Sequence, residues 1–148
     1  MLYIEISTKS WYYYSMSTEY RRTATTVSFL CYHFVFCPRY RRKIFLIPGV
    51  EDRFKELTRR GCEKEGFDIL TMECEADHVH LLLKCGPEQS PTEIMHIVKG
   101  FSSRELRNEF PELAAMPSLW TRNYFASTAG NVSAAAIRRY VETQKNRP

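Results

Sequence analysis

Two histidines separated by one residue are the sharpest chemical feature of this sequence. They stand in the stretch DHVHLLL, residues 77–83. This pattern predicts a β-strand, whose side chains alternate between two faces, so that His78 and His80 point away from the core together. Two neighbouring imidazoles can hold a divalent metal ion. From the residues alone, surface histidines without a metal and a zinc site using Cys74 or Cys85 stay open as alternatives, although the parity of Cys85 turns it away from both histidines.

A tyrosine and a glutamine near the C-terminus supply a second candidate pair. Tyr140 and Gln144 are four residues apart and share one face of a predicted helix. The phenol could serve in catalysis or could simply pack in the core. A phenol has a pKa of about 10 and is mostly protonated at neutral pH. Its attack on a phosphodiester therefore gains from a divalent metal that polarises the phosphate oxygens. Gln144 can add a third ligand oxygen to the two imidazoles, with water and phosphate in the remaining positions.

The elements that must position these residues follow a recognisable order. Branched and aromatic residues predict strands, and spaced apolar residues between caps predict helices. The expected strands are Ser28–Phe36, Phe67–Glu75, His78–Lys84 and Leu119–Ala126. Helices are expected from Val50 to Gly66, from Ser90 to Pro111 and from Ser133 to Lys145. This β-α-β-β-α-β order predicts an α+β, ferredoxin-like or RRM-like fold with a four-stranded antiparallel sheet, plus an extra C-terminal helix that carries Tyr140.

The second helix has the clearest boundary signals. Ser90 is a predicted N-cap, with proline in the first turn and Glu93 placed to complete a capping box. The expected buried stripe of this helix consists of Ile94, Ile97, Val98 and Phe101.

Composition limits the class of protein. The chain has 148 residues, 44% apolar and 26% charged, which suits one domain with a proper core. Residues 1–27 are expected to be an N-terminal extension, and residues 28–148 the functional domain. No apolar run reaches the roughly 18–20 residues that a membrane span needs. Five irregularly spaced cysteines argue against a disulfide framework and for a cytoplasmic protein.

Charge is distributed unevenly along the chain. Residues 1–43 hold seven basic and two acidic side chains, residues 44–119 nine and fourteen, and residues 120–148 five and one. The two basic ends would suit a polyanion such as nucleic acid if the fold brings them together. The candidate DNA contacts are Arg39, Tyr40, Arg41, Arg42, Lys43, Arg104, Arg138 and Arg139.

Taken together, these motifs resemble the single-tyrosine HUH transposases of the insertion-sequence 200/605 family, the TnpA type. The matching stretches run in the same order from about Ser28 to the C-terminus. They are YHFVFCPRYRR (32–42), DHVHLL (77–82), KGFSSR (99–104), LW (119–120) and YVETQ (140–144). The sequence departs from the family pattern at Ala76, where proline is usual, and in its longer N-terminal extension.

The resemblance implies a metal-dependent DNA strand-transfer enzyme. It assigns the metal site to His78, His80 and Gln144, and the nucleophile to Tyr140, which would form a 5′-phosphotyrosine link. It further implies Mg²⁺ or Mn²⁺ as cofactor and single-stranded DNA with hairpin ends as substrate. Such enzymes are homodimers in which the tyrosine helix of one subunit can complete the histidine site of the other.

Two other functions fit parts of the pattern. A nickase of the replication-initiation or relaxase type uses a related histidine motif but usually places its tyrosine differently. A non-catalytic RRM-like module has the same order of elements, but nothing in the chain matches the RRM signature strand, and the histidine pair would have no purpose. A covalent DNA adduct would distinguish both enzymes from the binding module.

Overall fold

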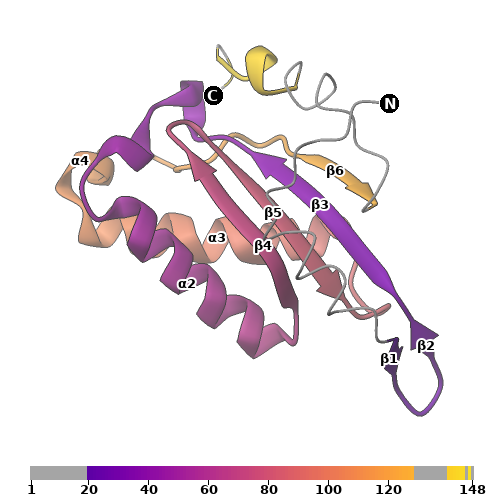
Figure 1. Ribbon diagram of the computed structural model, residues 1–148. Coiled ribbons are helices and arrows are strands. Elements are labelled where there is room, and N and C mark those ends of the chain that lie inside the picture. The colour runs from indigo at the N-terminus through magenta and orange to yellow at the C-terminus, as the bar shows by residue number, and fades with distance from the viewer. Residues whose placement is uncertain (1–19, 129–139, 146, 148) are drawn as a thin grey trace.

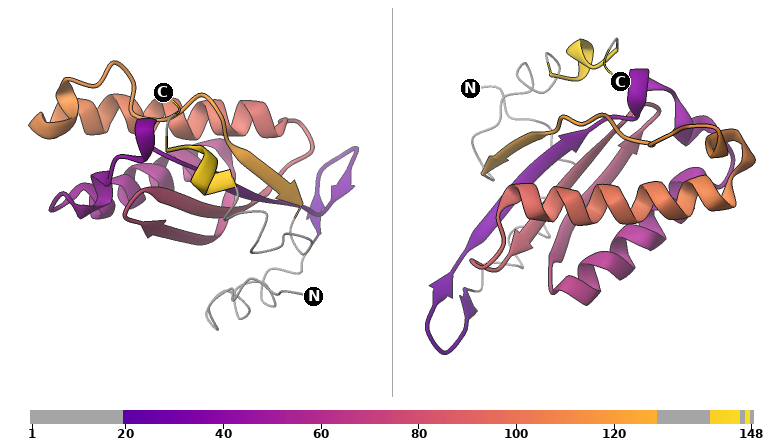
Figure 2. Two further views of the ribbon diagram at one scale, coloured as in Figure 1. Left: turned by 90° about the horizontal axis from the view of Figure 1, so that it is seen from above. Right: turned by 180° about the vertical axis from the view of Figure 1, so that it is seen from behind.

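The computed structural model describes residues 20–128, 140–145 and 147. Its main sheet is antiparallel, in the order β4-β5-β3-β6, and α2 and α3 cover one of its faces (Figures 1 and 2). The strands of this sheet are β3 (Leu30–Phe36), β4 (Asp68–Glu75), β5 (His78–Cys85) and β6 (Phe125–Thr128). The helices are α2 (Val50–Glu65), α3 (Pro91–Glu109) and α4 (Pro111–Ala114), with two 3₁₀ turns, η1 (Arg39–Arg41) and η2 (Ile44–Leu46).

This arrangement confirms the predicted ferredoxin-like α+β fold. β3 pairs with both β5 and β6, and β4 pairs with β5, all antiparallel. Residues 140–143 are helical and belong to the expected C-terminal helix, whose earlier part lies outside the described residues. We call the sheet face that α2 and α3 leave uncovered the open face.

Local signals set the ends of both long helices. Gly66 ends α2 in the left-handed conformation (φ 75°), where its N–H reaches back to the last turn, and a glycine adopts that conformation without a Cβ clash. At the start of α3, the Ser90 side chain accepts a hydrogen bond from the Glu93 amide (3.2 Å). The predicted N-cap is therefore confirmed.

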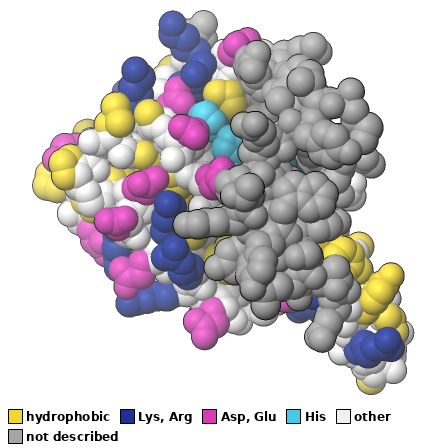
Figure 3. Space-filling view, in the orientation of Figure 1, with side chains coloured by type: hydrophobic (Ala, Val, Ile, Leu, Met, Phe, Trp, Pro, Cys, Tyr) yellow, Lys and Arg dark blue, Asp and Glu magenta, His cyan; other side chains and the backbone are white. Residues whose placement is uncertain are grey.

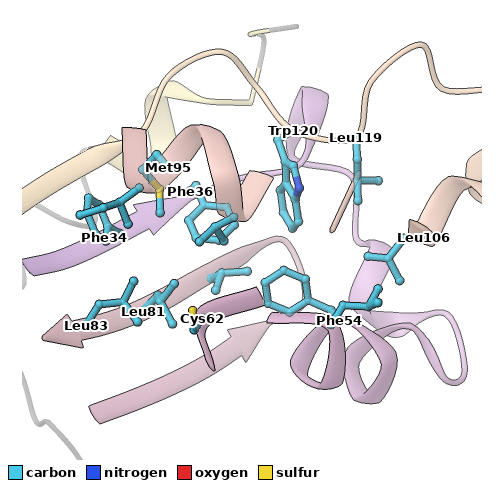
Figure 4. Close-up of a cluster of buried hydrophobic side chains, with 14 of the residues drawn as sticks. Phe34, Phe36, Phe54, Cys62, Leu81, Leu83, Met95, Leu106, Leu119 and Trp120 are labelled. Atoms are coloured by element: carbon cyan, nitrogen blue, oxygen red, sulfur yellow. The ribbon is translucent and has the colours of Figure 1, made fainter. Parts of the chain in front are cut away.

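The core lies between the sheet and the two helices (Figure 4). Phe34 and Phe36 of β3 and Leu81 and Leu83 of β5 are fully buried there. Aromatic rings from three elements meet in this layer, and the Phe36 and Trp120 centroids are 4.9 Å apart. Because alternate residues of β3 and β5 fill the core, the remaining residues of both strands must face the open side.

Two expectations about these elements were wrong. The last strand begins at Phe125 rather than Leu119. Trp120 forms an isolated bridge with Pro38, and the Lys99 ammonium binds the Thr121 and Asn123 carbonyls (2.5 and 3.2 Å) in the irregular segment that follows. Phe101 is 43% exposed instead of buried. The buried side of α3 carries Ile94, Met95, Val98, Ser102, Ser103 and Leu106.

A small hairpin precedes the main sheet. Its strands are β1 (Arg21–Arg22) and β2 (Val27–Ser28), so Ser28 ends the hairpin instead of beginning the first long strand. The preceding residues 1–19, most of the expected extension, lie outside the described part of the chain. Among the described helices, none is long and apolar enough to cross a membrane.

Candidate active site

The histidine pair lies on the open face at the beginning of β5. The His78 and His80 ring centroids are 4.9 Å apart, whereas the alternating Val79 is fully buried in the core. Figure 3 shows histidine side chains at the surface beside acidic side chains. A third imidazole, His33 of β3, lies 5.7 Å from His80 by ring centroids. Sequence reasoning missed His33, although the alternation along β3 places it on this face.

The environment of each histidine controls its proton. Burial, together with the neighbouring His78 and His33, lowers the pKa of His80 to about 4. Burial also lowers the pKa of His33. His80 is therefore neutral at physiological pH, as a metal ligand must be. His78 Nδ1 donates to the Asp77 carboxylate (2.9 Å), which leaves Nε2 as its lone-pair nitrogen.

The phenol of Tyr140 packs on the same face, one strand away from the histidines. Tyr140 belongs to a cluster with Val35, Cys37, Phe125 and Val141, and its ring centroid is 5.9 Å from that of Phe125. Val35 is the cross-strand partner of Phe125 on one side. On its other side Val35 pairs with His80 of β5. The fold thus brings the C-terminal segment beside the histidine pair.

Two polar atoms of this segment are buried without a partner. Tyr140 Oη and Gln144 Oε1 make no hydrogen bond among the described residues, and Gln144 is only 2% exposed. Burial raises the pKa of Tyr140 above its ordinary value, helped by Cys37 and only partly offset by Arg147. The phenol oxygen in this arrangement is protonated and buried, although the ring is partly exposed.

The donors named from the sequence are of kinds that bind divalent metal ions. Within the described ranges, no three or more His, Cys, Asp or Glu side chains are arranged to hold a metal ion. The donors expected from the sequence are the two imidazoles and the amide oxygen of Gln144, which makes no hydrogen bond within the described part of the chain. Cys74 and Cys85 pack on the core side of the sheet, so they do not join the histidines in a zinc site.

The candidate DNA-binding residues named from the sequence lie in different surroundings. Arg42 and Lys43 are exposed, and the guanidinium of Arg42 lies 5.9 Å from the ring centroid of the half-exposed Tyr40. Arg41 is bound to Asp77. Arg39 is partly buried, Arg104 is exposed on α3 in the layer opposite the histidines, and Arg138 and Arg139 lie outside the described residues.

Three residues of the KGFSSR stretch turn out to hold the segment before β6. Lys99 binds two carbonyls of that segment, as described above. Ser102 Oγ accepts from Trp120 Nε1 (2.9 Å), and Ser103 Oγ accepts from the Leu119 amide (3.1 Å). The sequence motif signalled these residues as a group but not this role.

Comparison with known proteins places the chain among transposases. A family model described as "Transposase IS200 like" matches residues 26–144. The ISDra2 transposase TnpA of Deinococcus radiodurans is 30% identical over 138 residues, covering 91% of this chain and 98% of the relative. The IS200 transposase of Salmonella typhimurium is 37% identical over 117 residues, covering 76% and 75%.

Solved structures agree with the fold. The crystal structure of a putative transposase from Deinococcus radiodurans superposes with a TM-score of 0.76 at 28% identity, covering 84% of this chain and 97% of that one. A REP-associated tyrosine transposase bound to a REP hairpin shares the fold with a TM-score of 0.54 at 13% identity, covering 84% and 68%. The match over residues 26–144 and the near-complete coverage of a curated relative show that this chain belongs to the IS200-like family of transposases.

Proposed function

We propose that this transposase cuts and rejoins single-stranded DNA through a covalent link to Tyr140. The observation that carries the proposal is the packing of Tyr140 over Val35 and Phe125, because Val35 is the cross-strand neighbour of His80. In the proposed step, the phenol oxygen bonds to phosphorus and the bond from phosphorus to the 3′ oxygen breaks. The phenol proton is lost and the departing 3′ oxygen gains one, which leaves a 5′-phosphotyrosine and a free 3′-OH.

Rejoining reverses this chemistry. A 3′-OH attacks the phosphotyrosine, a new phosphodiester forms, and the tyrosine regains its proton. The covalent link keeps the energy of the original phosphodiester, so the cycle needs no ATP.

We assign metal binding to His78, His80 and Gln144, with Mg²⁺ or Mn²⁺ as the ion. A bound divalent ion would polarise the scissile phosphate and offset its negative charge. The neutral state of His80 and the unpartnered oxygen of Gln144 support this assignment. Because Tyr140 is enclosed and its pKa is raised, we infer that the phenol must become exposed to the phosphate before cleavage.

We propose hairpin-bearing single-stranded DNA as the substrate and a homodimer as the working form. The fold is shared with a transposase whose structure was solved with a REP hairpin. The exposed Arg42, Lys43 and Tyr40 lie in the loop whose backbone contacts Arg147 (Tyr40 N to Arg147 O, 2.9 Å). The basic loop therefore meets Arg147 of the C-terminal segment near the proposed site, and such a surface suits phosphates and an unpaired base.

The decisive experiment is a search for the covalent adduct. Labelled single strands from both flanks of the gene, chosen for hairpin-forming ends, are incubated with protein and Mg²⁺ and resolved on a denaturing gel. We expect an adduct with the wild-type chain and none with Tyr140→Phe, which removes only the phenol oxygen. Because that oxygen has no hydrogen-bond partner among the described residues, folding and hairpin binding should persist.

Tyr124→Phe is the matched control. Tyr124 also carries a phenol, but its oxygen is hydrogen-bonded to Thr92 (2.9 Å). We expect this variant to form the adduct normally, and His78→Ala to form none while keeping most of its DNA affinity. An adduct that survives Tyr140→Phe would move the nucleophile to another residue.

A further inference from the structure

The turn η1 has a backbone conformation that its residues do not favour. Tyr40 (φ 57°, ψ 22°) and Arg41 (φ 50°) both adopt the left-handed region, and neither is glycine. Such a conformation is strained for side chains with a Cβ and persists only where surrounding contacts hold it. Two sets of contacts hold these residues in place.

The first contact ties the turn to the C-terminal segment. The Tyr40 N–H donates to the Arg147 carbonyl (2.9 Å), and the Arg147 N–H donates to the Gln144 carbonyl (3.1 Å). The turn thus anchors the backbone just after the proposed nucleophile and third metal ligand.

The second contact reaches the histidine pair. Arg41 places Nε and Nη2 each 2.9 Å from one Asp77 oxygen, and the other Asp77 oxygen accepts from His78 Nδ1 (2.9 Å). The three side chains are mostly shielded, with exposures of 26% for Arg41, 13% for Asp77 and 17% for His78. Burial opposes the charge of Asp77, but the hydrogen bonds and charges of His78 and Arg41 outweigh it and keep the pKa of Asp77 below its ordinary value.

We propose that Arg41 and Asp77 are positioning residues that fix the ring orientation and tautomer of His78 for metal binding. The inference rests on the proposed function of His78 as a metal ligand. A carboxylate that accepts the Nδ1 proton leaves Nε2 free to bind the ion and limits rotation of the ring. The guanidinium holds that carboxylate with two nitrogens, a geometry that an ammonium group cannot reproduce.

This role differs from the one that the sequence suggested for Arg41. The Arg41 guanidinium could bind a DNA phosphate only by leaving the shielded Asp77 carboxylate. That carboxylate would then be buried without a cation, which is costly. Arg42 and Lys43, which are exposed, carry no such cost. In this proposal Arg41 of the basic loop orients the metal site, whereas Arg42 and Lys43 bind the DNA.

Two measurements on the full chain test the proposal. The first is Mn²⁺ affinity, measured by titration calorimetry or by the signal of free Mn²⁺ in electron paramagnetic resonance. We expect Asp77→Asn to weaken binding about 10- to 100-fold, the range typical when the partner behind a metal ligand is removed. Arg41→Met should weaken it in the same direction but less, and Arg41→Lys should restore only part of the loss, because an ammonium keeps the charge of the ion pair but not its two-nitrogen geometry.

The second measurement is the tautomer of His78, read from nitrogen-15 NMR of the imidazoles without metal. We expect a proton on Nδ1 in the wild type and a mixture of tautomers in Asp77→Asn. Arg59→Met, which removes an exposed arginine from α2, is the control and should change neither measurement. Circular dichroism confirms that each variant is folded.

The outcomes separate this inference from the proposed function. Wild-type Mn²⁺ affinity and an unchanged His78 tautomer in both Arg41→Met and Asp77→Asn would overturn the positioning role. If the wild type bound no Mn²⁺, or His78→Ala bound it equally well, the metal assignment itself would fail. The metal-free tautomer would still decide whether Asp77 and Arg41 orient the ring.

Discussion

The protonation of His80 links the proposed site to the stability of the whole chain. Its imidazole has a pKa of about 4 in the folded chain because it is buried beside two other imidazoles. In the unfolded chain the value returns to about 6.5. Between these two values the unfolded chain binds more protons than the folded one, so stability is retained above pH 6.5 and lost as the pH falls towards 4.

We therefore expect the metal-free protein to lose stability on acidification. This one imidazole accounts for about 2 kcal/mol of lost unfolding free energy between pH 7 and pH 5. Urea unfolding in EDTA at both pH values measures the loss, which should be smaller in His80→Gln. His96→Gln, at an exposed position on α3, should lose as much as the wild type. An equal pH dependence in His80→Gln and wild type would contradict the assignment.

At the scale of elements, α3 holds the segment that leads into β6. Ser103 Oγ is the acceptor for the Leu119 amide in a buried position. Ser103→Ala removes that acceptor, and leaving a buried N–H unsatisfied costs about 1–3 kcal/mol of unfolding free energy. Urea unfolding at pH 7 checks this value. Ser118→Ala, whose hydroxyl makes only a long 3.4 Å contact, should change stability by less than about 0.5 kcal/mol.

The loop after β3 provides the element-scale prediction for DNA binding. We expect Arg42→Ala combined with Lys43→Ala to weaken hairpin binding. The slope of log K against the logarithm of the salt concentration should become less steep by about 0.7–0.9 for each phosphate that the loop no longer neutralises. Fluorescence anisotropy at several salt concentrations measures both quantities. Arg59→Ala combined with Lys64→Ala removes the same charge from α2 and should leave the slope unchanged. Equal slopes in both double variants would remove the loop from the DNA interface.

At the scale of the molecule, the core and the proposed site lie on opposite faces of the sheet. Helices α2 and α3 bury one face of the sheet (Figure 2). The histidines and Tyr140 occupy the open face. In this structure the Tyr140 segment packs against the sheet of its own chain. The residues of the proposed site that the structure describes therefore lie together within one chain.

Mixing two defective proteins tests that arrangement. We expect a mixture of Tyr140→Phe and His78→Ala to form no adduct, because every site would carry one defect. Exchange of subunits in the mixture must be confirmed, for example by mass spectrometry of the assembled species. Recovery towards half of the wild-type cleavage would instead show that the partner's tyrosine completes the histidine site, as the resemblance implies.

The sequence by itself determined the features that depend on near neighbours. The Ser90 cap needs only the amide of Glu93, and the end of α2 needs only a glycine that tolerates a left-handed backbone. The alternation around Val79 fixed the shared face of His78 and His80, because side-chain direction in a strand has a period of two. The ordered motifs likewise sufficed to indicate the family.

Only the tertiary structure decided what depends on residues far apart in the chain. Lys99 holds the segment before the last strand, because its ammonium reaches carbonyls more than twenty positions away. His33 becomes a neighbour of His80 only when β3 and β5 pair. Arg41 reads from the sequence as one more basic residue, yet its guanidinium lies against Asp77. A charge pattern gives the number of cations, but the packing of strands and turns determines which of them remain available to a substrate.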